Sequence, residues 1–301
     1  RLIWWPSARS ARVSSATFSG EELVTEKYPE IVEFALQLPN GTALDGEIVV
    51  HNGEQVLPFS LLQKRIGRKT VGKKILADAP IKFIAYDILE CDTEDIRTHP
   101  QDKRRTQLEE IQEATNHPNF LISHLLIKGT WQEYQELREK SRQHYAEGFM
   151  LKRKSSNYQM GRKRGDWWKW KVDPLTIDAV LIYAMRGHGR RANLFTDYTF
   201  AVWNGDQLVP FAKAYSGLTD AEFKEVDKFV KKNTIEKFGP VRSVTPELVF
   251  ELAFEGIAES TRHKSGIALR FPRMHRWRKD KPANEANTLA DLKGLLNEYG
   301  T

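Results

Sequence analysis

The sequence contains a single cysteine, Cys91, among 301 residues. One cysteine cannot close an internal disulfide or support a cysteine-based metal site, a pattern that fits a reducing cytoplasm. No apolar run reaches the length of a membrane-spanning helix. The run from Leu2 to Trp5 is too short for a signal peptide and is followed by arginines. These absences predict a cytoplasmic protein that has no membrane segment and no disulfide framework.

Positive charge is present in excess and is concentrated in two stretches. Lysines and arginines number 46 against 40 acidic residues, which gives a formal charge of +6 and a pI near 9.2. Eight of these cations lie between Glu147 and Asp173 beside three acids, and eight more lie between Arg262 and Lys281, where Asp280 is the one acid. Two such stripes favour a nucleic-acid partner over the evenly spread charge of a mildly basic housekeeping protein.

The order of the predicted elements indicates a mixed α+β domain followed by a small β-barrel. A chain of 301 residues suits two domains better than one. We place the boundary between residues 173 and 174, because Pro174 cannot continue a central strand. Short strands with one inserted helix at 174–301 match an OB-type barrel. The expected strands are 42–51, 81–89, 120–127, 168–172, 176–184, 194–203, 207–214 and 248–254, and the expected helices are 103–115, 131 towards 145, 220–233 and one after 288.

Three local signals mark where helices begin. Pro29 must lie at a helix start, since it would break a helix interior. Thr130 with Glu133, and Thr219 with Glu222, have the spacing of a capping box, in which each side chain bonds the other residue's backbone N–H. We therefore expect Pro29 to lie at a helix start or to break the helix, and two other helices to begin directly after Thr130 and Thr219.

The stretch 147–173, EGFMLKRKSSNYQMGRKRGDWWKWKVD, has the richest chemistry. A strand from Trp168 to Val172 places Lys169 and Lys171 on one face, while Trp168, Trp170 and Val172 pack on the other. Two ammonium groups facing the Glu147 carboxylate, which we expect two strands away, form a site for a phosphate bridged by a divalent cation. For an isolated K-x-K, a solvated basic hairpin is the alternative interpretation.

Further motifs accompany this stretch. L-D-G-E occurs at 44–47 and F-I-A-Y-D-I-L at 83–89, and R-H-K-S-G-I-A-L-R-F-P-R at 262–273 precedes R-K-D-K at 278–281. With E-G-F-M-L-K and W-x-K-x-K, these segments resemble the motifs of the covalent nucleotidyltransferases, a superfamily of ATP-dependent DNA ligases, RNA ligases and mRNA capping enzymes. The pattern is most similar to bacterial ATP-dependent DNA ligases and covers the chain from about residue 20 to 282.

The resemblance implies a DNA ligase, or its catalytic core, that seals 3′-hydroxyl/5′-phosphate nicks in duplex DNA through enzyme–AMP and DNA–AMP intermediates. ATP and Mg²⁺ would be its cofactors, and repair, replication or recombination its setting. It further implies an N-terminally incomplete adenylation domain at 1–173, an OB-fold domain at 174–301, and a monomer on nucleoid DNA in a bacterial cytoplasm.

The resemblance also assigns roles in the nucleotide pocket. Tyr86 would stack on the adenine, and Glu47 would hold the ribose hydroxyl or orient the metal. Glu147 would bind the catalytic cation, while Lys169 and Lys171 would hold the α-phosphate of AMP. Without the resemblance, Glu47 reads as a strand carboxylate paired with a lysine. Tyr86 then reads as a core residue, the role that we expect for its neighbour Phe83.

The basic residues after the barrel strands receive two roles. Arg278, Asp280 and Lys281 would act on the pyrophosphate leaving group. The residues expected to contact DNA are Arg262, Lys264, Arg273 and Arg276. The alternative for the 262–264 segment is a solvated turn, and His263 has no second His or Cys at ligand spacing that would make it a metal ligand.

One family motif is missing from the sequence. Members of the superfamily attack ATP with the lysine of a K-x-D-G motif, and no K-x-D-G occurs here. Phe18-Ser19 stands where the family has a Ser-Arg pair, and the chain starts at Arg1, so we expect a truncation or a reading-frame disturbance before Gly20. The chain should then fail at self-adenylation. An RNA ligase or capping-type enzyme, and a non-catalytic OB-fold nucleic-acid-binding protein, remain as alternatives.

Overall fold

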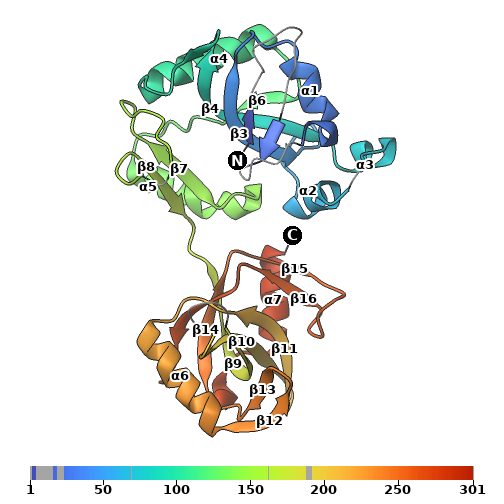
Figure 1. The fold of residues 1–301 in the computed structure, drawn as a ribbon, viewed down its shortest axis with the longest axis vertical. Helices are drawn as coiled ribbons and strands as arrows, with labels where there is room; N and C mark the ends of the chain where they lie inside the picture. Colours follow the sequence, from blue (N-terminus) through green and yellow to red (C-terminus); the bar gives the residue numbers. More distant parts are fainter. Residues whose placement is uncertain are drawn as a thin grey trace. The chain divides into compact units, whose positions relative to one another are not determined.

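The computed structural model describes the backbone of residues 2–4 and 16–18 and the full residues 24–68, 70–161, 163–187 and 192–300. The chain divides into two compact units, Arg1–Val172 and Asp173–Thr301, and each has a hydrophobic core of its own (Figure 1). No helix within the described ranges combines the length and the apolar character needed to cross a membrane.

The first unit mixes strands and helices, as the sequence predicts. Its strands are β1 (Leu2–Trp4), β2 (Ala16–Phe18), β3 (Ala43–Val50), β4 (Ile81–Cys91), β5 (Glu94–Asp95), β6 (Phe120–Ile122), β7 (Gly148–Lys152) and β8 (Trp167–Lys171). Its α-helices are α1 (Pro29–Ala35), α2 (Phe59–Ile66), α3 (Lys73–Asp78), α4 (Gln101–Thr115) and α5 (Trp131–Glu139).

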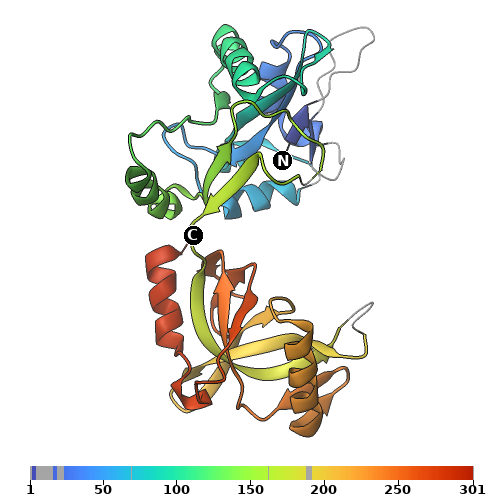
Figure 2. The ribbon, with the colours of Figure 1, turned by 90° about the vertical axis from the view of Figure 1, so that its left-hand side faces the viewer.

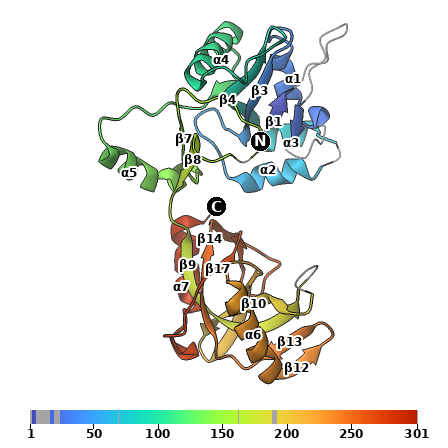
Figure 3. The same ribbon diagram turned by 60° about the vertical axis from the view of Figure 1, so that its left-hand side comes forward.

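The main sheet of this unit has the strand order β2-β1-β3-β4-β5, and β6 pairs with β4 in parallel. α1 and α4 pack against β4 (Figure 3). The core between them is aromatic: the rings of Phe34 and Phe120 stack at 4.9 Å, and Phe83 is fully buried beside both. The prediction that Phe83 is a core residue is confirmed.

Four of the sequence predictions for this unit concern the end of a helix or of a strand. α1 has Pro29 at its first position, and α5 begins with the Thr130–Glu133 capping box, both as expected. Two segments are shorter than predicted, since β6 ends at Ile122 and α5 ends at Glu139, followed by a 3-10 helix at Ser141–His144. Apolar residues continue beyond β6, but Leu125 and Ile127 are exposed and pair with no strand.

The second unit is a curled antiparallel half-barrel, consistent with the expected OB fold (Figure 2). Its strands are β9 (Leu175–Arg186), β10 (Phe195–Asn204), β11 (Gln207–Ala214), β12 (Thr234–Phe238), β13 (Val241–Val244), β14 (Val249–Phe254), β15 (Gly256–Glu259), β16 (Ile267–Arg270) and β17 (Arg273–Trp277). Its helices are α6 (Asp220–Lys232), which has the predicted Thr219–Glu222 capping box, and α7 (Leu289–Tyr299).

The long strand β9 gives this sheet its curvature. Along one edge it pairs first with β14, over 175–180, and then with β13, over 183–185. On its other edge the register with β10 shifts twice, and such irregularities bend a strand and increase its twist. Phe200, Phe250 and Leu252 are fully buried inside the curl.

Sequence patterns did not predict α2, α3, β12, β13 or the strands after Phe254. The basic segment at Arg273–Trp277 was expected to follow the barrel, whereas it is itself a barrel strand, β17, paired with β14. Its one buried side chain is Met274; Arg273 and Trp277 are half-buried, and His275 and Arg276 are exposed. Because this strand has so few apolar residues, it does not show the alternation of apolar and polar residues from which strands are usually predicted.

Candidate functional site

The β7–β8 hairpin brings Glu147 and Lys171 together. Gly148 pairs with Lys171 in the register, and a Cβ on Gly148 would lie 2.3 Å from the carbonyl oxygen of Trp170. With its φ of +131°, this position requires glycine. The close approach leaves Glu147 Oε2 2.7 Å from Lys171 Nζ. The carboxylate therefore lies beside the neighbouring strand, and the expectation that it lies two strands away is wrong.

Lys169 and Lys171 are both exposed on β8. Of the three residues expected to pack on the opposite face of this strand, Trp168, Trp170 and Val172, not all do so. Val172 is buried, and the Trp170 ring lies edge-on to two other aromatic rings. Trp168, expected to pack on this face, is 46% exposed. The hairpin has only two strands and is too narrow to cover both tryptophans of this face. Trp170 packs against neighbouring rings, and Trp168 is exposed to solvent.

α5 fixes the end of the hairpin. Arg138 lies over the Trp170 ring at 5.0 Å and donates a hydrogen bond to the backbone carbonyl of Lys171. The backbone that carries the Lys171 ammonium is thus held from a separate helix.

Tyr86 is half-buried on β4, and its hydroxyl is held by a buried acid. The hydroxyl donates to Asp45 Oδ1 at 3.1 Å, and the Tyr158 hydroxyl donates to the other carboxylate oxygen of Asp45 at 2.6 Å. Asp45 belongs to the L-D-G-E segment on β3 and is fully buried. Glu47, two residues further along β3, is exposed and forms no ion pair in the described part of the chain.

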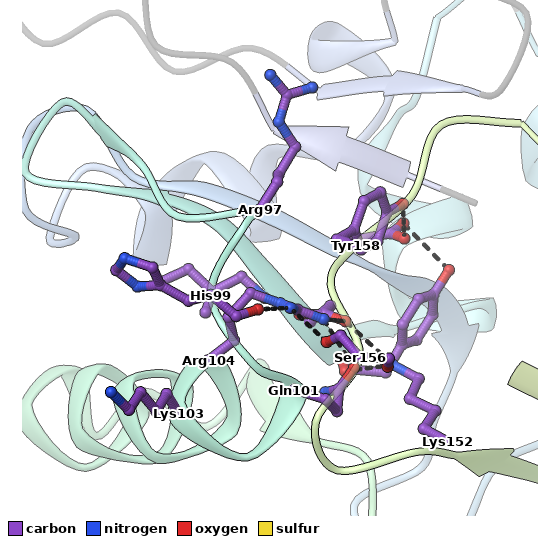
Figure 4. Close-up of polar contacts among 12 residues, drawn as sticks. Arg97, His99, Gln101, Lys103, Arg104, Lys152, Ser156 and Tyr158 are labelled. Carbon is purple, nitrogen blue, oxygen red and sulfur yellow. Dashed lines mark hydrogen bonds and ion pairs between the residues drawn. The ribbon is translucent and has the colours of Figure 1, made fainter. Parts of the chain in front are cut away.

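Asp87, the residue after Tyr86 on β4, belongs to a buried ion-pair network with Arg104 and Lys152, which are labelled in Figure 4. Lys152 Nζ lies 3.2 Å from Asp87 Oδ2 and donates to the carbonyl of Tyr86 at 3.0 Å. Arg104 Nε lies 2.8 Å from Asp87 Oδ1, and neither side chain is exposed. Burial lowers the pKa of Lys152, although the Asp87 carboxylate opposes that shift.

The same network reaches the loop between β7 and β8. Arg104 donates to the carbonyl of Ser156 at 3.1 Å, and Trp167 Nε1 lies 3.2 Å from Ser156 Oγ. The Lys152 ammonium also sits 4.0 Å from the centre of the Trp167 ring. Buried charged side chains therefore connect three elements: the strand that carries Tyr86, the helix α4, and the hairpin that carries Lys169.

Sequence reasoning assigned no role to Asp45, Asp87, Arg104 or Tyr158. Two signals were present. Asp87 is a charged residue inside the apolar strand 81–89, and Arg104 lies four and seven residues before Leu108 and Ile111 on the buried face of α4. A charged residue in a core position needs a partner, and the two satisfy one another.

In the second unit, Arg278 and Lys281 converge on Asp178. Arg278 Nη1 lies 2.8 Å and Lys281 Nζ 2.7 Å from Asp178 Oδ2. Asp178 Oδ1 is buried and has no hydrogen-bond partner among the described residues. Asp280 accepts from the Arg278 guanidinium, and this hydrogen bond lowers the pKa of Asp280 to about 2. The structure thus brings together all three residues of the predicted R-x-D-K set.

The four residues expected to contact DNA fall into two groups. Arg273 is paired with Glu255 at 3.0 Å, and Arg276 is paired with Glu251 at 2.7 Å. Arg262 and Lys264 lie in the exposed turn between β15 and β16 and form no ion pair within the described ranges.

No group of three or more His, Cys, Asp or Glu side chains within the described residues is arranged to hold a metal ion. Glu147, which is paired with Lys171, belongs to no such group. Mg²⁺ is commonly bound by one or two carboxylates together with substrate phosphates, so this arrangement suits an ion that arrives with a nucleotide.

Two family models match the chain. The ATP dependent DNA ligase domain matches residues 14–171, and the ATP dependent DNA ligase C terminal region matches residues 191–281. Among curated proteins, a probable DNA ligase of Koribacter versatilis is 34% identical over 88% of this chain and 50% of its own length. A DNA ligase of Thermococcus fumicolans is 32% identical over 92% of this chain and 51% of its own length. The chain thus spans about half the length of these relatives.

Solved structures share the fold. Pmar-Lig_PreS3 superposes with a TM-score of 0.67 at 14% identity, covering 92% of this chain and 61% of the other. A Lig E DNA ligase gives a TM-score of 0.57 at 18% identity, covering 92% of this chain and 88% of the other. The ligase domain model alone spans more than half of the 301 residues, and on this ground the chain belongs to the family of ATP-dependent DNA ligases.

Proposed function

We propose that this chain is the catalytic core of an ATP-dependent DNA ligase that seals 3′-hydroxyl/5′-phosphate nicks in duplex DNA. The observation that carries the proposal is the β7–β8 hairpin, on which Glu147 and Lys171 are in contact and Lys169 shares the exposed face of Lys171. In the sealing step the 3′-hydroxyl attacks the 5′-phosphate of DNA–AMP. A phosphodiester forms, the phosphoanhydride breaks, AMP leaves and the hydroxyl proton passes to solvent.

Lys169 and Lys171 would stabilise the phosphate oxygens in this step. Phosphoryl transfer depends mainly on positive charge placed where oxyanion charge develops. Lys171 is held in place by Glu147, whereas Lys169 is exposed and forms no ion pair among the described residues. Glu147 would hold Mg²⁺ jointly with the phosphate, and the ion would supply further charge neutralisation.

Tyr86 would provide the stacking face for adenine. Its hydroxyl bond to the buried Asp45 fixes the ring before the base arrives, so little conformational freedom is lost on binding. Glu47, exposed on the same strand as Asp45, would hold a ribose hydroxyl.

Arg278 and Lys281 would bind the pyrophosphate released from ATP, with Asp280 orienting Arg278. Arg278 and Lys281 both form ion pairs with Asp178, so the Asp178 carboxylate takes the position that an anionic ligand of these two cations would take. A polyphosphate would compete with Asp178 for the same donors.

The missing K-x-D-G motif defines the first experiment. We expect the chain to seal a nick that already bears 5′-AMP, since this step needs no lysine adduct, and to leave an unmodified nick open even with ATP and Mg²⁺. Lys169→Met should abolish sealing of the adenylated nick and retain DNA binding. Lys154→Met is the matched control, because Lys154 is an exposed lysine in the loop of the same hairpin. Absence of sealing by folded wild-type protein would contradict the proposal.

Two further measurements separate the alternatives, and a third tests self-adenylation. Preferential sealing of nicked RNA would favour an RNA ligase. Salt-sensitive DNA binding without sealing would favour a non-catalytic binding protein. Intact mass after incubation with ATP and Mg²⁺ tests self-adenylation. A gain of one AMP would mean that the chain contains a lysine nucleophile outside a K-x-D-G motif.

A further inference from the structure

A groove of about 560 Å³ lies in the second unit between the β15–β16 turn and α7. Figure 1 shows α7 beside this hairpin, and α7 packs against β15. The lining includes Lys264 from the turn and Lys293 and Asn297 from the helix, with Glu259 at the base of the turn. Residues about thirty positions apart in sequence thus share one concave surface.

Both walls of the groove are fixed by local structure. The turn is closed by the hydrogen bond from Ser260 N to the carbonyl of Gly266 at 2.7 Å, and Ser260 Oγ lies 2.7 Å from His263 Nδ1. On the other side, α7 buries Leu292 in the barrel core. Lys293 and Asn297 are one turn apart on the helix, so their side chains lie on the same face.

The cations of this groove differ from those of β17 and of the R-x-D-K segment in their partners. Arg273 and Arg276 are already paired with carboxylates, and so are Arg278 and Lys281. Lys264 and Lys293 are exposed and form no ion pair with any described residue. An incoming phosphate can therefore bind the two lysines without displacing an internal carboxylate.

We propose that this groove binds a backbone phosphate of duplex DNA through Lys264 and Lys293. The inference rests on the proposed ligase function and extends the DNA-contacting surface from the basic strand β17 to α7, a helix to which the sequence assigned no role. A phosphodiester suits the site because it carries one negative charge and several acceptor oxygens, which two ammonium groups and the Asn297 amide can bind. Glu259 opposes this binding by its charge.

The test is the salt dependence of duplex DNA binding, measured by fluorescence anisotropy on the full chain. Each phosphate contact contributes about 0.9 to the slope of log K against log salt concentration. We expect Lys293→Gln and Lys264→Gln each to weaken binding on all sequences alike, and the double variant to reduce the slope by about one, since the two lysines share one phosphate. The matched control is Lys228→Gln, which removes one charge from an exposed position on α6, outside the groove. Glu259→Gln should act in the opposite direction and tighten binding.

Two results would overturn the inference. If Lys293→Gln and Lys228→Gln bind with the same affinity and slope, the groove is not a phosphate site, while the ligase proposal stands on the sealing assay. If the wild-type chain does not bind duplex DNA, both the inference and the DNA-binding part of the proposed function fail. Thermal unfolding should be unchanged in all the variants, because each substituted side chain is exposed.

Discussion

Glu147 and Lys171 lie 2.7 Å apart across adjacent strands of the β7–β8 hairpin, so the predicted metal ligand and one predicted phosphate ligand are partners of each other. The Glu147 side chain is 40% exposed and the Lys171 side chain is 41% exposed. Exposed pairs contribute little to stability, commonly 0 to about 1 kcal/mol. The pair is thus better suited to place two charges for a ligand than to stabilise the fold.

From this pair we predict that Glu147→Gln leaves the free energy of unfolding within about 1 kcal/mol of wild type. Sealing of an adenylated nick should fall by roughly 10²-fold or more, as for removal of one transition-state electrostatic contact, and the Mg²⁺ concentration for half-maximal rate should rise. Single-turnover sealing across a Mg²⁺ series measures both. Asp166→Asn is the control, since Asp166 pairs with Arg153 on the same hairpin at 3.2 Å. An equal loss in both variants would mean that only the hairpin structure was disturbed.

In contrast to the exposed Glu147–Lys171 pair, the buried Asp87–Arg104 pair should contribute strongly to the free energy of unfolding. Asp87→Asn leaves the unexposed Arg104 guanidinium and the Lys152 ammonium without their shared carboxylate. Breaking a buried pair in this manner costs about 3–5 kcal/mol. Asp95→Asn is the matched control, because Asp95 and Arg97 form an exposed pair in the same unit and their loss should cost less than about 1 kcal/mol after solvent screening. Urea unfolding compares the two; similar costs would contradict the structural role of the buried network.

The Arg278–Asp280 contact predicts a measurable titration. The side-chain hydrogen bond from Arg278 lowers the pKa of Asp280 from 3.8 to about 2. The stabilisation from this contact is fully present above the unfolded value of 3.8 and is lost as the pH falls through about 2. Carboxyl NMR should show the Asp280 pKa return towards 3.8 in Arg278→Met. A pKa that stays near 2 in this variant would assign the shift to another group.

The division at Val172 and Asp173 predicts two unfolding transitions. Thr219→Ala removes the capping box of α6, which costs about 1 kcal/mol, and should lower only the transition of the second unit. Asp87→Asn should lower only the other transition. Calorimetry of the single variants and the double variant tests this, and a shift of both transitions by either substitution would mean that the units unfold together.

Much of the fold could be predicted from the sequence because local chemistry specified it. The capping boxes before α5 and α6 lie in short, self-contained segments, and the apolar runs of β3, β4, β9 and β10 need no distant partner to be recognised. β17 lacks such a signal, because four of its five residues are not buried and its pairing with β14 is what makes it a strand.

For the candidate site as well, some features follow from the local sequence and others from tertiary packing. The family motifs and the two stripes of positive charge can be recognised in the sequence, and so can the strand face shared by Lys169 and Lys171, since side-chain alternation is a local property. Which charges neutralise one another depends on the folded structure. Asp178 accepts both Arg278 and Lys281, Asp87 accepts Arg104 and Lys152, and Lys264 and Lys293 form no ion pair with any described residue. Electrostatic contacts depend on distance in space, and distances between residues far apart in sequence are set by the packing of the core.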